Sequence, residues 1–191
     1  SREQAIEKIT KNSKLYLDQN ATAITATLSQ YRGSGKEGQK QYIWNISIRD
    51  PREIKMDGIA SFRAYSNAGV DAKTGEIISF YANVKSADQM SQEELEAAKK
   101  KASKEQCLAI FEAFAKSQNA KQFASTKQSS VVPDYIYDYI KELPVYGGYA
   151  FHHIRTNENI PYEDNYFSGS VAAITGKVIQ YQNNQQHTSL E

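Results

Sequence analysis

The sequence contains few of the residues that hold small domains together covalently or through metals. Cys107 is the one cysteine among 191 residues, so no internal disulfide can form, and a cysteine-based metal site would need other ligand types. The net charge of +1 gives no electrostatic basis for binding nucleic acid or an anionic membrane. No segment is apolar for long enough to span a bilayer, no signal peptide is visible, and no cofactor is indicated.

The residues that are present suit a folded protein. Hydrophobic residues make up 40% of the chain, which is adequate for a packed core. The 13 tyrosines against one tryptophan suit either recognition surfaces or ordinary β-strands. The chain begins at Ser1 rather than Met, so we interpret it as a trimmed fragment without its targeting segment. Residues 186–191 are expected to be a polar tail, either native or a tag remnant.

Two stretches of the sequence recur at nearly the same spacing. Ser1–Ile6 returns as Ser103–Leu108, and Val70–Phe80 returns as Val171–Tyr181. Matches at both ends of a unit predict two copies of one module, each close to the lower common size for a domain. A residue present in one copy only is therefore a poor candidate for an activity that both copies share.

Each copy opens with a predicted helix. Ser1 and Ser103 stand three residues before Gln4 and Gln106, which is the spacing of a capping box. Apolar residues follow at helical spacing in both copies. Cys107 aligns with Ala5 in this apolar stripe, so we interpret it as a small core residue and not as a nucleophile.

Strands are predicted after each helix. Residues 21–31 alternate loosely, and Gln41–Ile48 places apolar residues on one face at every second position. The clearest signal is a hairpin that occurs in both copies, with turns at Thr74-Gly75 and Thr175-Gly176. Glycine after a polar turn residue supplies the positive φ that such turns need.

These elements predict an α+β fold of two tandem modules, each a helix packed on an antiparallel sheet. The first module is assigned to residues 1–87 and the second to residues 103–185. Residues 88–102 are expected to form a helical connector, because Ser91 and Glu94 form a further capping box and Glu93–Lys101 is helical and highly charged. The sequence leaves open whether the two modules pack together.

This repeated pattern resembles the YcdB/YcdC repeat group of PepSY-like domains. The pieces that carry the resemblance are the capped helices at Ser1–Ile9 and Ser103–Phe114, the aromatic strands at Tyr42–Ile48 and Tyr149–Arg155, and the hairpins at Val70–Phe80 and Val171–Tyr181. Phe151–Pro161 also resembles the family's aromatic–Arg–Asn–Ile–Pro stretch. The second copy departs from the pattern at Ala172, where the first has Asp71, so a ligand role for Asp71 would not be shared.

The resemblance implies a setting and a kind of partner. Members of this family are typically secreted or envelope-attached bacterial proteins, and PepSY modules are associated with inhibiting or regulating peptidases. The resemblance therefore implies an extracellular or cell-envelope location and a peptide or protein partner, such as a peptidase. It supplies no catalytic residues, and we expect neither enzyme activity nor a metal site.

The second copy contains the unshared residues that are candidates for partner binding. His152 and His153 are neighbours in a predicted strand, so their side chains point to opposite faces and cannot chelate one ion together. With Arg155 they form a candidate partner-binding group. An enzyme site around these three residues is a further alternative, and it would need a pocket of convergent polar groups.

The stretch Asp134–Ile140 has the strongest potential for interaction. Read as a strand, it places Tyr135, Tyr137 and Tyr139 on one face; read as a helix, it gives an ordinary core stripe. A tyrosine-lined face would bind a peptide or a glycan, whereas the alternative role is packing between the modules.

The function favoured by these observations is non-catalytic binding or regulation. An exposed sheet edge or a concave face would hold an extended peptide by strand addition, with tyrosine side chains giving selectivity. The alternative function is a structural spacer repeat within a larger surface-layer or wall-anchored protein.

Overall fold

The structure is a computed structural model, and it describes residues 1–32, 40–52, 63–85, 89–97, 102–138, 143–158 and 160–184. Its helices are α1 (Arg2–Thr10), α2 (Gln92–Ala97) and α3 (Lys104–Ala124). Its strands are β1 (Ala23–Arg32), β2 (Lys40–Arg49), β3 (Tyr65–Asp71), β4 (Ile77–Ala82), β5 (Thr126–Asp138), β6 (Leu143–Asn157), β7 (Ile160–Ala172) and β8 (Lys177–Asn184).

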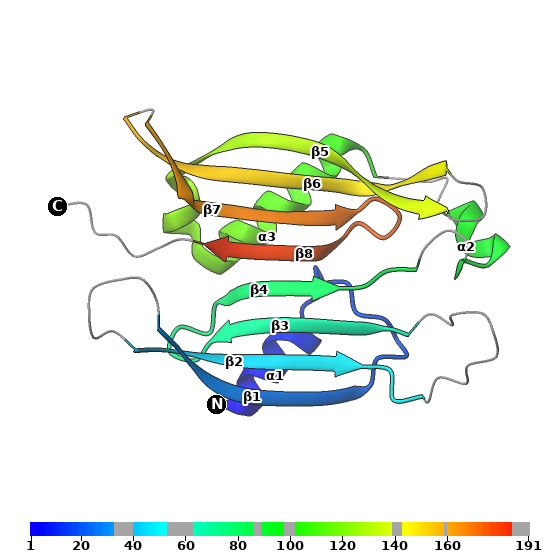
Figure 1. The fold of residues 1–191 in the computed structure, drawn as a ribbon, viewed down its shortest axis with the longest axis horizontal. Coiled ribbons are helices and arrows are strands. Elements are labelled where there is room, and N and C mark those ends of the chain that lie inside the picture. The colour runs from blue at the N-terminus through cyan, green and yellow to red at the C-terminus, as the bar shows by residue number, and fades with distance from the viewer. Residues whose placement is uncertain are drawn as a thin grey trace.

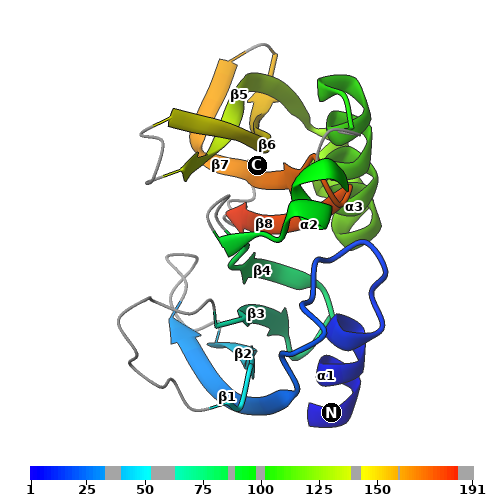
Figure 2. The same cartoon turned by 90° about the vertical axis from the view of Figure 1, so that its right-hand side faces the viewer.

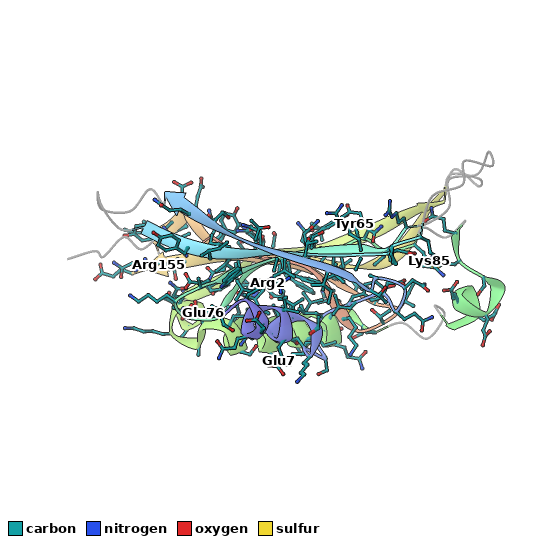
Figure 3. All side chains as sticks on the ribbon, turned by 90° about the horizontal axis from the view of Figure 1, so that it is seen from below. Arg2, Glu7, Tyr65, Glu76, Lys85 and Arg155 are labelled. Atoms are coloured by element: carbon teal, nitrogen blue, oxygen red, sulfur yellow. The ribbon has the colours of Figure 1, made fainter. Side chains whose placement is uncertain are left out.

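All eight strands form one antiparallel sheet in the order β1-β2-β3-β4-β8-β7-β6-β5 (Figure 1). We call α1 with β1–β4 the first half and α3 with β5–β8 the second half; the two halves meet where β4 pairs with β8. Helices α1 and α3 lie on the same side of the sheet (Figure 2, Figure 3). We call the other side the open face. The architecture is thus α+β with an antiparallel sheet, which agrees with the fold class that the sequence predicts.

Local sequence signals set the helix starts and the hairpins. Both predicted capping boxes are confirmed, since Ser1 and Ser103 each accept a hydrogen bond from the backbone N–H of the glutamine three residues later. Both predicted hairpins form, with Gly75 at φ +73° and Gly176 at φ +62°, where other residues would be strained. The Asp71 carboxylate accepts two backbone N–H groups of the first turn at 2.8 Å each.

Equivalent residues of the two recurring stretches meet at the junction of the halves. Phe80 of β4 pairs with Tyr181 of β8, and each is the last residue of its stretch. The flanking pairs are Ser79 with Gln182 and Tyr81 with Gln180. A residue that pairs with its own counterpart indicates a local two-fold relation between the halves.

Each half also reaches across the junction to the last strand of the other. After α1, the N–H of Tyr16 donates to the carbonyl of Val178, and the Val178 N–H donates to the Lys14 carbonyl, each at 2.9 Å. From α3, the buried Gln118 side chain accepts a hydrogen bond from the N–H of Ile77 at 3.1 Å. The two halves are therefore interlocked and do not hang as separate beads.

The core lies between the sheet and the two helices. Helix α3 contributes Phe111 and Phe114, both fully buried, and the Phe114 ring lies 4.9 Å edge-on from that of Tyr181. Helix α1 contributes the fully buried Ile9. Cys107 is also fully buried, which confirms its interpretation as a core residue, and burial raises the pKa of its thiol.

One sequence alignment needs correction. Trp44 pairs with Val70 as Tyr149 pairs with Val171, so Trp44 and not Tyr42 corresponds to Tyr149. An offset of two residues leaves every side chain on the same face of a strand. The alternating pattern therefore fitted both alignments, and only the strand pairing distinguishes them.

The structure also resolves two predictions about local elements. Residues 134–138 belong to β5, so the strand alternative is correct for this part of the tyrosine-rich stretch and the helix alternative is wrong. Within the predicted connector, α2 begins with the expected capping box, in which Ser91 and Glu94 exchange hydrogen bonds.

Candidate binding surfaces

The outermost strands of the described sheet, β1 and β5, differ as edges. From Ala23 to Tyr31 the sequence of β1 has no charged residue and no proline, and all ten of its residues pair with β2 without a bulge. In contrast, β5 contains Lys127 and Pro133, and its pairing with β6 shifts register twice. Charges, proline and bulges are the devices that protect sheet edges from further pairing. They occur in β5, whereas the first nine residues of β1 have none of them.

Apolar side chains remain exposed beside β1. Leu28 is 46% exposed, Ile24 is 37% exposed, and Tyr42 on the neighbouring strand is 44% exposed. Because α1 packs mainly against β2, it does not cover these side chains. A strand added next to β1 would meet both the backbone groups that point away from β2 and the exposed apolar side chains.

A shallow hollow of about 510 Å³ crosses the open face at the junction of the halves. It follows two rows of residues that pair across β1, β2, β3, β4 and β8. The first row is Thr25, Ser47, Asn67, Tyr81 and Gln180, and the second is Thr27, Asn45, Gly69, Ser79 and Gln182. We call this hollow the polar trough, because the described side chains that line it from this face carry hydroxyl or amide groups.

Tyr81 belongs to the first row of the polar trough, and Tyr65 lies beside that row. Tyr65 lies on the side of the sheet opposite α1 and α3 (Figure 3), and its ring centroid is 5.7 Å from that of Tyr81. Both rings are partly exposed, at 37% for Tyr65 and 44% for Tyr81. Among the described residues that line the trough none is charged, although Arg49 donates a hydrogen bond to Ser47 at 3.1 Å.

The predicted tyrosine-lined surface falls on the protected edge. Tyr135 and Tyr137 belong to β5, and Tyr139 lies outside the described residues. Their role in partner binding remains a prediction. Tyr135 pairs with Tyr146 of β6, the strand that also carries the two histidines.

His152 and Arg155 are both half-buried, and His152 lies on the open face. The His152 Nδ1 lies 2.9 Å from the Ser129 hydroxyl, and its ring centroid is 4.9 Å from that of Tyr166. The Arg155 guanidinium lies 5.9 Å from the centre of the Tyr162 ring. These contacts hold the two side chains apart from His153, so the three do not converge on one pocket.

His153 is the candidate that the structure corrects. Its side chain points to the opposite face from His152, as the sequence predicts, but it is 3% exposed beneath α3, between the rings of Phe111 and Phe123. It therefore does not belong to the exposed partner-binding group. Burial lowers the pKa of His153, while Glu112, whose Oε1 lies 3.9 Å from Nε2, opposes this effect.

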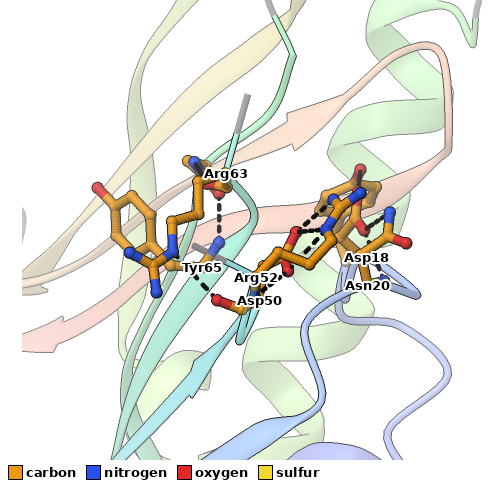
Figure 4. Close-up of polar contacts among 8 residues, drawn as sticks. Asp18, Asn20, Asp50, Arg52, Arg63 and Tyr65 are labelled. Atoms are coloured by element: carbon orange, nitrogen blue, oxygen red, sulfur yellow. Dashed lines mark hydrogen bonds and ion pairs between the residues drawn. The ribbon is translucent and has the colours of Figure 1, made fainter. Parts of the chain in front are cut away.

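The charged residues at the ends of β2 and β3 form a structural brace (Figure 4). Asp50 accepts hydrogen bonds from Arg52 Nε at 2.9 and 2.8 Å, which lower its pKa to about 2. Arg63 donates to the Asp50 carbonyl at 3.0 Å, and Asn83 links Arg63 to Tyr65. These charge-assisted and backbone hydrogen bonds satisfy the charged groups within the fold.

The Asp71 carboxylate likewise makes its hydrogen bonds within the fold. Burial raises its pKa, but hydrogen bonds from the Gln41 side chain and from two turn N–H groups outweigh that effect and hold the pKa below its ordinary value. Within the described ranges, no three His, Cys, Asp or Glu side chains are grouped as a metal site would require. The described helices also include none with the length and apolarity to cross a membrane.

Comparison with known proteins identifies a relation of fold. No family model matches the chain, and no curated protein sequence matches it. The structure is similar to the Bacillus megaterium YpeB C-terminal domain, with a TM-score of 0.55 and 13% identity. The match covers 100% of this chain and 64% of that one, so the chain spans less than two thirds of its length. This similarity supports a PepSY-like relation for the fold.

Proposed function

We propose that this protein is a non-catalytic module that binds an extended peptide segment of a partner protein by adding it as a strand beside β1. The observation that carries the proposal is the difference between the sheet edges, since β1 is long and unbroken, with no charge before Arg32, while β5 is protected. An unprotected edge strand is a template for strand addition.

The partner strand would be held by backbone hydrogen bonds and by apolar contacts. Every second residue of β1 directs its N–H and C=O groups away from β2. Each net hydrogen bond contributes about 0.5–1.5 kcal/mol, part of which offsets the ordering of the peptide. Contacts with the exposed Ile24 and Leu28 would supply the remaining affinity and favour apolar residues at alternate positions of the partner.

The finer parts of the proposal concern family, partner and setting. We propose that the two halves are tandem PepSY-like modules of the YcdB/YcdC group, that the partner is a peptidase or its substrate segment, and that the module acts outside the cell or in the bacterial envelope. The repeated sequence pattern and the similarity of fold to the YpeB domain support this reading.

A paired lysine scan of the two edges tests the proposal. The probe is a fluorescent ten-residue peptide with valine at alternate positions and lysine at both ends, titrated by anisotropy. Leu28→Lys is expected to weaken binding at least ten-fold, because it places a charge on the β1 edge. Val132→Lys on β5 is the control, since Val132 is similarly exposed at 53%, and should change binding less than two-fold.

Equal effects of the two lysines, or absence of peptide binding, would contradict the proposal. Light scattering at the same concentrations shows whether β1 instead pairs with a second copy of the chain. A dimer that Leu28→Lys dissociates would replace the peptide partner by self-association. Inhibition of a secreted bacterial peptidase by the wild type, lost in Leu28→Lys, would establish the regulatory form of the function.

The structural spacer is the second candidate. The continuous sheet and the reciprocal contacts of Tyr16 and Gln118 across the junction favour a rigid unit. Further copies in the full-length gene, together with the lack of any peptide binding, would favour this function over strand addition.

A further inference from the structure

The polar trough on the open face has a chemistry that the proposed strand addition does not use. The described side chains of its two rows offer hydroxyls from Thr25, Thr27 and Ser79 and amides such as Asn67 and Gln180. Hydroxyls and amides each donate and accept hydrogen bonds. Such a surface suits a ligand that is itself dense in neutral groups of both kinds.

We infer that the polar trough binds an uncharged oligosaccharide, laid in an extended conformation across the strands. A charged ligand would find no opposite charge among the described lining residues. A peptide on this face would meet side chains alone, because the backbone groups of inner strands are already paired within the sheet. A sugar chain instead presents hydroxyls along its whole length and needs no free backbone.

The tyrosine pair formed by Tyr81 of the first row and the neighbouring Tyr65 fits the same ligand. Tyr65 and Tyr81 offer partly exposed ring faces with centroids 5.7 Å apart. The carbon-bound hydrogens on one face of a pyranose ring form an apolar surface that packs on aromatic rings. A ring platform beside neutral polar side chains therefore provides both kinds of contact that a sugar makes.

The dimensions of the polar trough match an extended chain of a few sugars. Its five strands are separated by four steps of about 4.8 Å, which gives a length of about 19 Å. An extended β-linked sugar chain advances by about one such step per ring, so each ring would lie over one strand. Gly69 lets the Ser79 hydroxyl of the second row lie close over β3, since a Cβ there would lie 2.6 Å from it.

The corresponding surface of the second half is different. By strand pairing, Val132, Ala150 and His152 stand where the first half has Thr27, Asn45 and Ser47. Two of these three polar positions are thus apolar, and the third is a histidine in contact with Ser129 and Tyr166. The counterparts of Thr25 and Asn67, Ser130 and Ser168, remain polar, so the two halves differ chiefly in the second row.

Titration with cellotetraose and chitotetraose, two neutral β-linked tetrasaccharides, tests the inference. We expect at least one of them to shift the side-chain amide resonances of Asn45, Asn67, Gln180 and Gln182 in ¹H–¹⁵N spectra. Gln180→Ala should weaken its binding about five-fold, and Asn67→Ala with Gln180→Ala more than ten-fold, as expected from loss of one or two neutral hydrogen bonds. Gln30→Ala, an exposed glutamine of β1 outside the trough, is the matched control and should leave affinity unchanged.

Three results would overturn the inference. The first is that neither sugar binds up to its solubility limit. The second is that the shifted resonances lie outside the trough or that Gln180→Ala and Gln30→Ala have equal effects. The third is that an uncharged Ser/Asn/Gly decapeptide displaces the sugar and shifts the same amides at lower concentration. Thermal unfolding of each variant confirms that it is folded.

Discussion

The two halves of the molecule have the same order of elements, a helix followed by four antiparallel strands, but their helices cover them differently. Helix α3 has 21 residues and packs across β6, β7 and β8, whereas α1 has 9 residues and packs mainly on β2. The second half is consequently closed over its aromatic core. The shorter α1 leaves the apolar side chains of Ile24 and Leu28 exposed along β1, so the two halves differ in how far their helices cover the sheet.

The largest effect on the free energy of unfolding should come from a substitution in the core beneath α3, compared with one on the exposed β1 edge. Phe111→Ala removes a fully buried ring of α3 and should lower the free energy of unfolding by about 3–5 kcal/mol. Leu28→Ala removes an apolar side chain that is 46% exposed and should cost less than about 1 kcal/mol. Urea denaturation of both variants measures the difference, and similar losses would contradict the comparison.

A smaller effect is expected at the contacts that cross the junction. Gln118→Ala would leave the N–H of Ile77 buried without an acceptor, which should cost about 1–3 kcal/mol. In the other direction the contact is made by backbone groups of residues 14 and 16, so Lys14→Ala should change stability by less than about 0.5 kcal/mol. Equal and small losses in thermal or urea unfolding would show that the side-chain contact is dispensable.

The smallest effect is a dependence on pH between 7.5 and 5 that comes from His153 of the second half. The folded-state pKa of His153 lies below the ordinary 6.5 because of burial, with Glu112 opposing and His152 and Lys116 adding to the lowering. The unfolded chain therefore binds the proton more readily, and the free energy of unfolding should fall as pH decreases below about 6.5. Urea unfolding between pH 7.5 and 5 should show this slope in the wild type and in His152→Gln, but not in His153→Gln. A slope retained by His153→Gln would assign it to another group.

Much of the local structure was predictable because it depends on residues close together in sequence. The capping boxes at Ser1, Ser91 and Ser103 need only a partner three residues away, and the turns at Gly75 and Gly176 need only a residue that tolerates positive φ. The burial of Cys107 followed from its place in a helical stripe.

The candidate surfaces were harder to predict because they depend on strand order. The uncharged run of Ala23–Tyr31 is visible in the sequence, but nothing local says that this strand is outermost. His153 was grouped with His152 as a candidate for partner binding, and only the position of α3 shows that its face is covered. The residues of the polar trough alternate with core residues on five strands, and no spacing along the chain brings them together.

The sequence by itself determined the elements of this protein, their repeated order and the alternation that gives each strand a buried side. These features arise from backbone propensity and from contacts between near neighbours in the chain. Only the tertiary structure decided that β4 pairs with β8, that β1 is an edge and that Thr25 and Gln180 line one hollow. Such pairings join residues far apart in sequence, and the packing of the whole sheet selects them.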